Sequence, residues 1–470
     1  MTTLRLDPST KAVGGGRVLV GGAPLRVIRL SATGARLFAA WCDGEPVGDK
    51  PHHRRLADKL ILAGMVHPAY DDAKLTPQDV TVVVPVRDHA DRLAGLLPHL
   101  AEVRETLVVD DGSAVPVPHA VDRHPVPRGP AAARNTGWRK VTTELVAFLD
   151  ADTRPEPGWL EPLLAQFEDP AVVAVAPRVR SEPGAGTLSR YERLRSSLDM
   201  GPVPAQVRPR GRITYLPTAA LVVRTSALQA IHGFDEELRF GEDVDLIWRL
   251  VDAGGSVRYE PRSEVVHAPR STWRGWLQQR YSYGTSAGPL ARRHGRKALA
   301  PVRVSGWTAL AWLAIAAGRP KTGAAIALAT AALLPRKLKP LDVPAEEALG
   351  IALRGHVAAG RFLADALTGA WGPVAVPLLA LSRRGRRVLA LAYARHLLDW
   401  ARTRPDVGPA RWLLARAADD LAYGAGVWRG CLAERQAGPL IPDLANWPAR
   451  RPPAPSTEAL RGADSIRKRR

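Results

Sequence analysis

The spacing of apolar residues changes along the chain and divides it into three regions. Residues 1–75 combine short alternating runs with two helical patterns, residues 78–288 alternate between apolar strands and helical segments, and residues 300–440 are mostly helical. A chain of 470 residues is longer than one typical domain, so we expect separate folding units. The Pro- and Arg-rich sequence at 447–470 is typical of a disordered tail.

The first region has the pattern of a small winged-helix-like module. Alternating apolar runs at 17–20 and 25–30 are joined by two glycines, which predicts a β-hairpin. A helical pattern begins at Ser31, a second helix is expected at 56–63, and a short strand at 65–66 follows it.

The central region predicts a doubly wound α/β fold. Four apolar runs have the composition of buried parallel strands, and helical patterns lie between them. Ligands of such sheets gather at the carboxyl ends of the strands, so polar side chains at those ends are candidates for a binding site. The predicted strands cover residues 80–85, 107–109, 145–149 and 172–176, with helical segments that include 90–100 and 129–138.

The third region leaves two structural alternatives open. Its apolar segments at 304–318 and 323–334 are each shorter than the about 20 residues that an ordinary membrane span needs. Trp307, Trp312 and the flanking Arg and Lys residues suit helices that lie in a membrane interface. A helical bundle without a membrane is equally compatible with the same pattern.

Composition and charge narrow the partners and the compartment. A hydrophobic fraction of 46% and a charged fraction of 24% are typical of a globular protein. The net charge of +20 favours anionic partners, namely nucleotide phosphates, nucleic acid or an acidic membrane leaflet. Two distant cysteines, Cys42 and Cys431, and an N-terminus without a signal-peptide pattern indicate a cytoplasmic protein, with the cytoplasmic face of the cell membrane as a further location.

The strongest chemical signal lies directly after the predicted strand at 145–149. There the sequence Asp150-Ala151-Asp152 places two carboxylates at the end of an apolar run. A hard divalent cation prefers oxygen ligands and keeps positions open for substrate phosphates. Such a cation also neutralises the charge that builds on a departing nucleotide diphosphate. A bare D-x-D is common by chance, and its position after a buried strand makes this one specific.

Three weaker motifs precede this pair. The strand at 80–85 ends at Pro85, so the turn after it would face a ligand. Asp110 and Asp111 follow the next strand, where they form either an Asx turn or a hydrogen-bond acceptor for a pyrimidine N–H. Arg134, in a helical segment of small residues, is either an ordinary surface arginine or a partner for a diphosphate.

Further candidates follow the pair along the chain. Asp243 begins a helical pattern, where it acts either as an N-terminal cap or as the general base that takes a proton from an acceptor hydroxyl. His267 closes a strand, as a metal ligand or as a loop residue, and Arg280 is placed to reach the diphosphate. Glu242 and Trp276 are the candidates for the acceptor side.

As an ordered set, these motifs resemble the family 2 glycosyltransferases of the GT-A fold, over residues 80–288. The resemblance implies inverting transfer from a nucleoside-diphosphate sugar, usually a UDP-sugar, with Mg2+ or Mn2+. It implies that Asp111 contacts the base with Asp110 beside it, that Asp150 lies near the ribose, that Asp152 binds the metal and that Asp243 is the base. The sequence at 278–281 differs from the Q-x-x-R-W motif of processive polysaccharide synthases, which weakens that interpretation.

The whole chain resembles a narrower family, the mycofactocin-system glycosyltransferases. The segment from 25–31 through 64–66 is similar to small winged-helix peptide-recognition domains, and the segment at 419–428 is similar to that family as well. The resemblance implies the addition of β-1,4-linked glucose to a redox cofactor derived from a ribosomal peptide. A peptide-derived acceptor is physically reasonable, because the strand edge and groove of a winged-helix module could bind an extended peptide by edge pairing.

Three other functions compete with this one. In the synthesis of a cell-envelope glycan or glycolipid, the apolar C-terminal helices would hold a lipid acceptor. A nucleic-acid-binding winged helix is disfavoured, since only Arg54, Arg55 and Lys59 lie near the helix at 56–63 and no basic, base-reading face is evident. A non-catalytic peptide chaperone would leave the ordered carboxylates unexplained.

Overall fold

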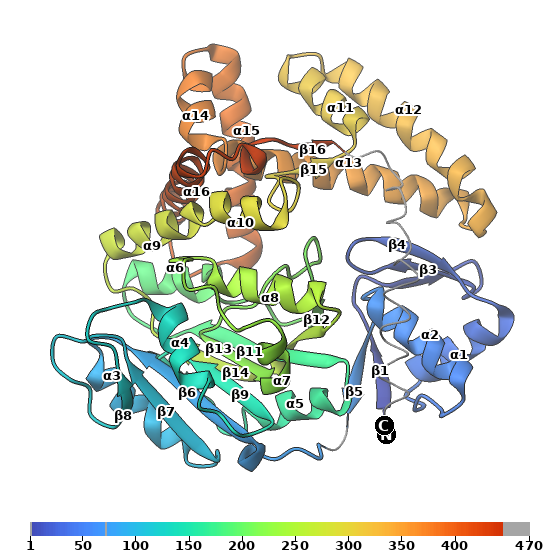
Figure 1. Ribbon diagram of the computed structural model, residues 1–470. Helices are drawn as coiled ribbons and strands as arrows, with labels where there is room; N and C mark the ends of the chain where they lie inside the picture. The colour runs from blue at the N-terminus through green and yellow to red at the C-terminus, as the bar shows by residue number, and fades with distance from the viewer. Residues whose placement is uncertain (1, 71–72, 445–470) are drawn as a thin grey trace.

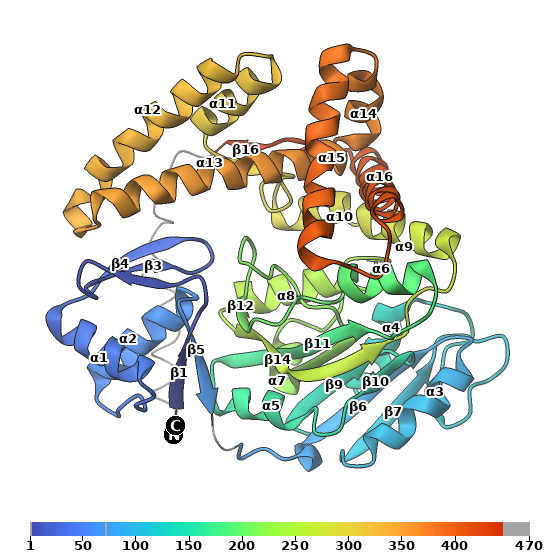
Figure 2. The same ribbon diagram turned by 180° about the vertical axis from the view of Figure 1, so that it is seen from behind.

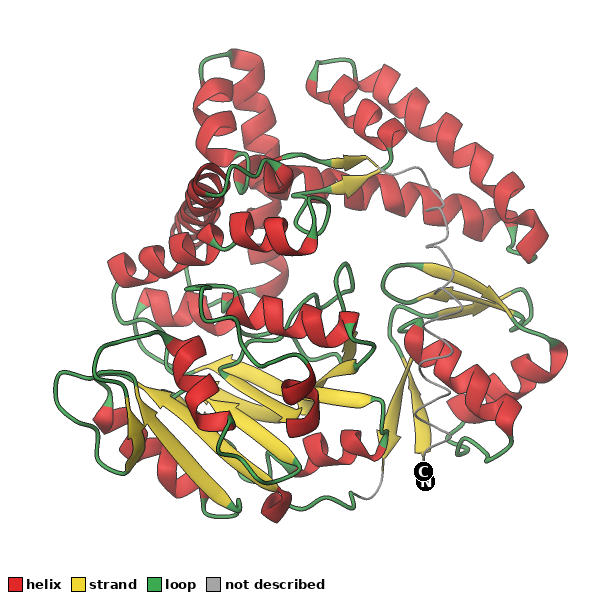
Figure 3. Ribbon diagram, in the orientation of Figure 1, coloured by secondary structure: helices red, strands yellow, loops and turns green. Residues whose placement is uncertain are grey.

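Three parts of the chain pack against one another around a central mixed sheet (Figure 1). This computed structural model describes residues 2–70 and 73–444. The predicted tail at 447–470 lies outside the described residues. Colouring by secondary structure shows the sheet between helices, with a mostly helical layer on the side where the C-terminal part lies (Figure 3).

The N-terminal unit contains the predicted hairpin and both predicted helices. β3 and β4 pair antiparallel, and Gly22 takes a φ of 79° in the turn between them. Ser31 caps α1 by accepting a hydrogen bond from the Gly34 N–H at 3.0 Å. The second helix begins at Pro51 rather than at 56, because proline is well suited to a first helical turn. The elements are β1 (Thr2–Leu6), β2 (Lys11–Val13), β3 (Val18–Gly21), β4 (Arg26–Arg29), α1 (Ala32–Cys42), α2 (Pro51–Leu62) and β5 (Val66–Tyr70).

The central sheet has the strand order β10-β14-β11-β13-β9-β6-β7-β8, with β12 paired to β14. β7, β6 and β9 are parallel neighbours, as predicted. β13 lies between β9 and β11 and is antiparallel to both, so the sheet is mixed rather than wholly parallel. The strands are β6 (Val80–Val86), β7 (Glu105–Asp110), β8 (Ala120–Arg123), β9 (Leu145–Leu149), β10 (Thr153–Pro155), β11 (Val172–Ser181), β12 (Ala205–Val207), β13 (Ala220–Arg224) and β14 (Ser256–His267).

Helices cover both faces of this sheet, which explains its unbroken apolar runs. Val82 and Val84 of β6 point into the core beneath α3 and α5, whereas Val83 points into the core beneath α4 and α8. The covering elements are α3 (Ala90–Leu96), α4 (Pro130–Trp138), α5 (Glu161–Leu164), α6 (Thr187–Arg195), α7 (Thr225–Ala230) and α8 (Glu242–Asp252), with short 3-10 turns at Pro77–Asp79, Leu97–Leu100 and Ala165–Glu168. The next helices, α9 (Trp273–Thr285) and α10 (Ala287–His294), pack against α16.

The C-terminal part is helical, as predicted. Among the described residues no single helix is long and apolar enough to cross a membrane; α13 and α14 meet that test only as a pair, and they bend by 92° at the break between them. The elements are α11 (Gly306–Ala316), α12 (Pro320–Leu338), α13 (Ala345–Thr368), α14 (Gly372–Ala380), α15 (Arg383–Thr403) and α16 (Pro409–Ala433), 3-10 turns at Lys339–Leu341 and Gly438–Leu440, and the parallel pair β15 (Arg303–Val304) and β16 (Asp443–Leu444).

The N-terminal unit contacts both other parts. Val18 and Val20 of β3 share an apolar cluster with Leu334 and Leu338 of α12, in agreement with the position of α12 above β3 in both views (Figure 2). On the other side, the segment between β12 and β13 reaches the unit through Arg212, which lies 2.9 Å from the buried carboxylate of Asp7. The unit is therefore joined to a loop of the central part as well as to the helices.

Four glycines let the helical part approach the central part closely. Gly284 of α9 and Gly288 of α10 lie against the backbone of α16, and Gly426 and Gly430 of α16 lie against the backbone of α9. A Cβ atom at any of the four positions would overlap a backbone carbonyl of the other helix. The glycines therefore fix the distance between α16 and the rest of the protein.

We expect Gly426→Ala to lower the free energy of unfolding by about 1–3 kcal/mol, because its methyl group would meet the Tyr281 carbonyl and force the helices apart. Urea unfolding followed by circular dichroism measures the change. Gly355→Ala is the matched control: Gly355 also lies inside a helix, but open space surrounds it, so alanine should raise stability by up to about 1 kcal/mol. Equal changes in the free energy of unfolding for the two substitutions would contradict the close approach of α16 to α9.

Candidate functional site

A cavity of about 1260 Å3 lies between the ends of the central strands and the C-terminal helices. Its walls come from the segments after β9 and β14, the first turn of α8, and helices α9, α13 and α16. Four predicted site residues, Pro85, Asp110, Asp111 and Trp276, are absent from its lining. Seven others line it: Arg134, Asp150, Asp152, Glu242, Asp243, His267 and Arg280.

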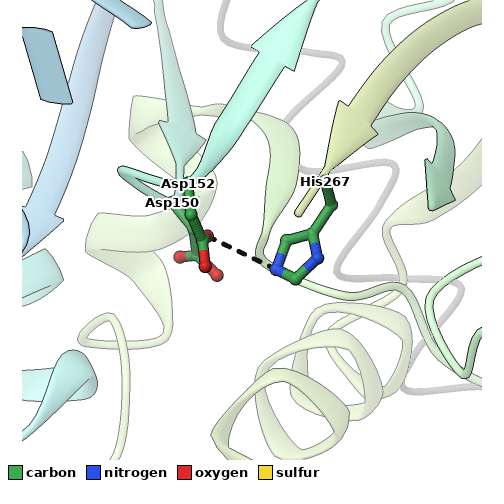
Figure 4. A group of neighbouring side chains, drawn as sticks. All are labelled: Asp150, Asp152 and His267. Atoms are coloured by element: carbon green, nitrogen blue, oxygen red, sulfur yellow. Dashed lines mark ion pairs between the residues drawn. The ribbon is translucent and has the colours of Figure 1, made fainter. Parts of the chain in front are cut away.

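Asp150, Asp152 and His267 form a compact group of metal-ligand side chains in this cavity (Figure 4). One potential ligand atom from each lies within 4.8 Å of the others, and Asp152 Oδ1 is 3.3 Å from His267 Nε2. The strand register brings them together: β10 runs antiparallel to β14, with Thr153 opposite His267. Two carboxylates and an imidazole are a donor set that fits a divalent metal ion.

Asp152 is strongly stabilised as a carboxylate. Burial opposes its ionisation, but the hydrogen bond from His267 and the positive charges of His267, Arg92 and Arg270 lower the pKa of Asp152 to about 2. Arg92 of α3 approaches to 3.0 Å. The His267 pKa is shifted in the opposite sense, because Asp152 outweighs the effect of burial and raises it. A metal ion bound by both side chains would displace the His267 proton.

Arg134 is buried and connects two carboxylates on different elements. Its Nη2 atom is 2.7 Å from Asp150 Oδ1, and its Nη1 atom is 3.0 Å from Glu242 Oε1. The sequence left two alternatives, an ordinary surface arginine or a partner for a diphosphate; in the structure Arg134 is buried and both terminal nitrogens are directed at protein carboxylates. Arg134 therefore ties the end of β9 to the start of α8.

Asp243 is the second residue of α8, and the residue before that helix, Gly241, is left-handed with a φ of 80°. Burial raises the pKa of Asp243 to about 7, and the negative charge of Glu242 adds to the rise. A hydrogen bond from the Val244 N–H at 2.8 Å and the charge of Arg134 oppose it. A carboxylate with a pKa near neutrality is well matched to general-base catalysis.

Asp110 and Asp111 lie behind the cavity lining and form hydrogen bonds with neighbouring loops. Both are buried, and Asp110 accepts a hydrogen bond from the Ser113 N–H at 2.9 Å. Asp111 accepts hydrogen bonds from the Arg128 and Gly129 N–H groups, each at 2.8 Å. These bonds hold the segment 127–131, which lines the cavity. The two carboxylates therefore fix loops beside the cavity, and contact of Asp111 with a base stays a prediction.

Arg280 and Trp276 differ most from the sequence expectation. Arg280 Nη2 is 2.6 Å from Glu192 Oε1, and its Nε is 3.2 Å from Asp419 Oδ1, so two carboxylates already neutralise its charge. Trp276 is 0% exposed and donates its indole N–H to Glu192 at 2.8 Å. This face of α9 packs against α6 and α16, which places Trp276 away from any acceptor in the cavity.

Several cavity residues were not predicted. Arg270 follows His267 by a short turn at the end of β14, and its position after a strand, like that of Asp152, was a signal that could have revealed it. Tyr215 lies in an irregular segment and carries no pattern. Tyr283 and Tyr423 lie in helices whose facing surfaces become apparent only when α9 and α16 pack together.

Comparison with known proteins identifies the family. The glycosyl transferase family 2 model matches residues 81–229. The pre-mycofactocin glycosyltransferase of Mycobacterium tuberculosis (strain ATCC 25618 / H37Rv) is 40% identical over 463 residues, which cover 94% of this chain and 97% of that protein. The succinoglycan biosynthesis protein ExoU of Rhizobium meliloti (strain 1021) is 29% identical over 41% of this chain and 60% of its own.

A solved structure, the mannosyltransferase PcManGT of Pyrobaculum calidifontis in complex with GDP-Man and Mn2+, is 17% identical, with coverage of 82% of this chain and 96% of that one and a TM-score of 0.38. The family assignment does not depend on this likeness, since the mycobacterial relative matches nearly the whole length of both chains. The chain belongs to the family 2 glycosyltransferases and, within them, to the family of the pre-mycofactocin glycosyltransferases of mycofactocin biosynthesis.

Proposed function

We propose that the protein transfers glucose from UDP-glucose to pre-mycofactocin, a peptide-derived redox cofactor, as a β-1,4-linked chain and with inversion at the anomeric carbon. The observation that carries the proposal is the meeting of Asp150, Asp152 and His267 with Asp243 in one cavity. The acceptor follows from the name of the mycobacterial relative. The donor and linkage follow from the resemblance of the whole chain to its family.

Asp152 and His267, with Asp150 beside them, are the residues that would hold a divalent ion. When bound, such an ion neutralises the charge that develops on the departing diphosphate. We favour Mn2+ over Mg2+, because Mg2+ prefers all-oxygen ligands whereas an imidazole nitrogen also suits Mn2+.

Asp243 takes the proton of the acceptor hydroxyl while the hydroxyl oxygen forms a bond to the anomeric carbon. The bond between that carbon and the diphosphate oxygen breaks in the same step, and its electrons leave with the diphosphate. The configuration inverts because the acceptor attacks opposite the leaving group, and no protein nucleophile takes part. Arg134 keeps Asp150 and the first turn of α8 in register during this step.

We also propose that two helical hairpins, α11–α12 and α14–α15, rest on an anionic membrane surface. Their tips are adjacent, since Arg384 packs over Gly318. Leu313, Leu378 and Leu381 are exposed near these tips, and Leu381 is 81% exposed. Exposed leucines beside cationic side chains suit an interface with acidic lipids. The exposed cationic residues at the tips are Arg319, Lys321, Arg383, Arg384, Arg386 and Arg387.

With UDP-glucose, Mn2+ and pre-mycofactocin, we expect products whose mass increases by whole hexose units, and EDTA should abolish their formation. Asp152→Asn and His267→Ala should each weaken Mn2+ binding by about 10- to 100-fold or more, since each removes a direct ligand. Calorimetry with Mn2+ measures this change. Asp122→Asn, which alters a surface carboxylate on β8, is the matched control and should bind Mn2+ normally. GDP-mannose or a lipid-linked acceptor used in preference would refute the donor or the acceptor, respectively.

For Asp243 the sign of the pH dependence follows from its raised pKa. The base must be ionised, so kcat/KM should fall about tenfold for each pH unit below about 7 and level off above it. The assay uses a saturating concentration of Mn2+ at every pH. The fall of kcat/KM below about pH 7 then reports Asp243 rather than loss of Mn2+ through protonation of its ligands. Asp243→Asn should abolish transfer while leaving Mn2+ binding intact. An acid limb that persists unchanged in an active Asp243→Asn variant would remove Asp243 from this role.

Vesicle sedimentation tests the membrane surface. The protein should bind vesicles that contain anionic phosphatidylglycerol and not vesicles of phosphatidylcholine alone. Leu381→Glu should weaken binding by about tenfold or more, because burial of one leucine contributes about 1.5–3 kcal/mol. Val115→Glu, at an exposed apolar position in the central part, should bind like the wild type. Equal loss in both variants would point to net charge rather than to the hairpin tips.

A further inference from the structure

The cavity extends well beyond the carboxylates that the proposed reaction uses. Its volume of about 1260 Å3 exceeds the roughly 300–1,000 Å3 of pockets that hold one drug-sized ligand. The additional wall is built by the C-terminal helices, where Asp365 of α13 and Arg416, Asp420 and Tyr423 of α16 are part of the lining. A second molecule therefore has room beside a nucleotide sugar.

Three tyrosines from three separate elements connect this wall to the catalytic carboxylates. Tyr215 precedes β13, Tyr283 lies in α9 and Tyr423 lies in α16, and all three line the cavity. The close packing of α9 and α16 sets two of them side by side, because Gly284 lies against the Tyr423 carbonyl. Burial raises the pKa of Tyr215, and the proximity of Asp243 and of the other two phenols adds to the rise.

Beyond the tyrosines the wall ends in charged side chains of α16. Asp420 lines the cavity, and its Oδ2 atom has Thr368 at 2.6 Å, Arg395 at 3.1 Å and His396 at 3.1 Å. Its Oδ1 atom has only Arg416 at 3.8 Å among the ion-pair partners in the described residues. The carboxylate is thus held firmly by one oxygen, while the other keeps capacity to accept hydrogen bonds.

We propose that Tyr215, Tyr283 and Tyr423, with Asp420 and Arg416 behind them, are the acceptor subsite. It would take a molecule with a ring and several hydroxyl groups. The ring lies on the phenol faces, one hydroxyl reaches Asp243, and more distant hydroxyls reach Asp420 and Arg416. A tyrosine suits such a ligand, because its ring can pack on the apolar face of the ligand ring while its hydroxyl group forms hydrogen bonds at the polar edge. This inference rests on the proposed function, because Asp243 must be the base.

A ring of this kind has two sources. One is the unglycosylated peptide-derived acceptor, and the other is a glucose that an earlier transfer has already attached. The shared chemistry is the hydroxyl-bearing ring, and the two acceptors can be assayed separately.

Tyr423→Ala tests the subsite, because 42% of Tyr423 is exposed and its removal should leave the packing of α16 intact. The KM for the acceptor should rise about tenfold, whereas the KM for UDP-glucose and the slow hydrolysis of UDP-glucose without acceptor should not change. Tyr423→Phe keeps the ring and should retain most of the affinity. Leu414→Ala, at a 70% exposed position of the same helix, is the matched control for effects on α16.

The outcomes separate this inference from the proposed function. A raised KM for pre-mycofactocin, for its monoglucosylated product or for both supports the subsite and identifies the source of the ring. An unchanged KM for both acceptors in Tyr423→Ala, with a melting temperature like that of the wild type, overturns the subsite and leaves the proposed function standing. Wild-type protein that neither hydrolyses UDP-glucose nor transfers glucose from it refutes the proposed function itself.

Discussion

The site depends on the two ion pairs that Arg134 forms with Asp150 and Glu242. Four carboxylates, Asp150, Asp152, Glu242 and Asp243, line one cavity, and like charges at such distances destabilise the fold unless cations lie between them. The buried guanidinium fork bonds Asp150 and Glu242 simultaneously, and a planar donor with five N–H groups suits this bridging better than a lysine. The bridge also connects β9 to α8, so the charge balance and the position of the proposed base are fixed together.

The second constraint is the distance between α16 and the central part. Glycines on both sides of this contact allow backbone to lie on backbone, and the same contact places Tyr283 next to Tyr423. The helical part is therefore a wall of the cavity rather than an appendage. The N-terminal unit contacts the loop that carries Tyr215. Arg212 of that loop forms an ion pair with Asp7 of the N-terminal unit. The central part and the C-terminal helices thus line one cavity, and the N-terminal unit supports one of its loops from outside.

Position after a buried strand was the most reliable sequence signal. It located Asp150 and Asp152, because apolar runs of five or six residues define where a strand ends. The pairing of Asp152 with His267 was within reach only as a hypothesis, since it requires the register of β10 on β14. The sequence could not predict the partners of the arginines, because a guanidinium binds a phosphate or a carboxylate equally well. The fold decides which of the two lies opposite, and for Arg134 and Arg280 it is a carboxylate. The sequence also could not predict that β13 is antiparallel to its neighbours, because an apolar run looks the same in a parallel and in an antiparallel strand.

If the proposed function holds, the charge distribution favours joint binding of the donor and the ion. The whole chain carries +20, so its long-range field attracts an anionic nucleotide sugar. At short range the carboxylates of Asp150 and Asp152 would repel a diphosphate placed beside them. In the proposed reaction, a divalent ion held by Asp152 and His267 would neutralise this repulsion, so the ion and the diphosphate would each bind more tightly when the other is present. Linkage makes that coupling reciprocal, so the affinity for the ion and the affinity for the donor must rise by the same factor.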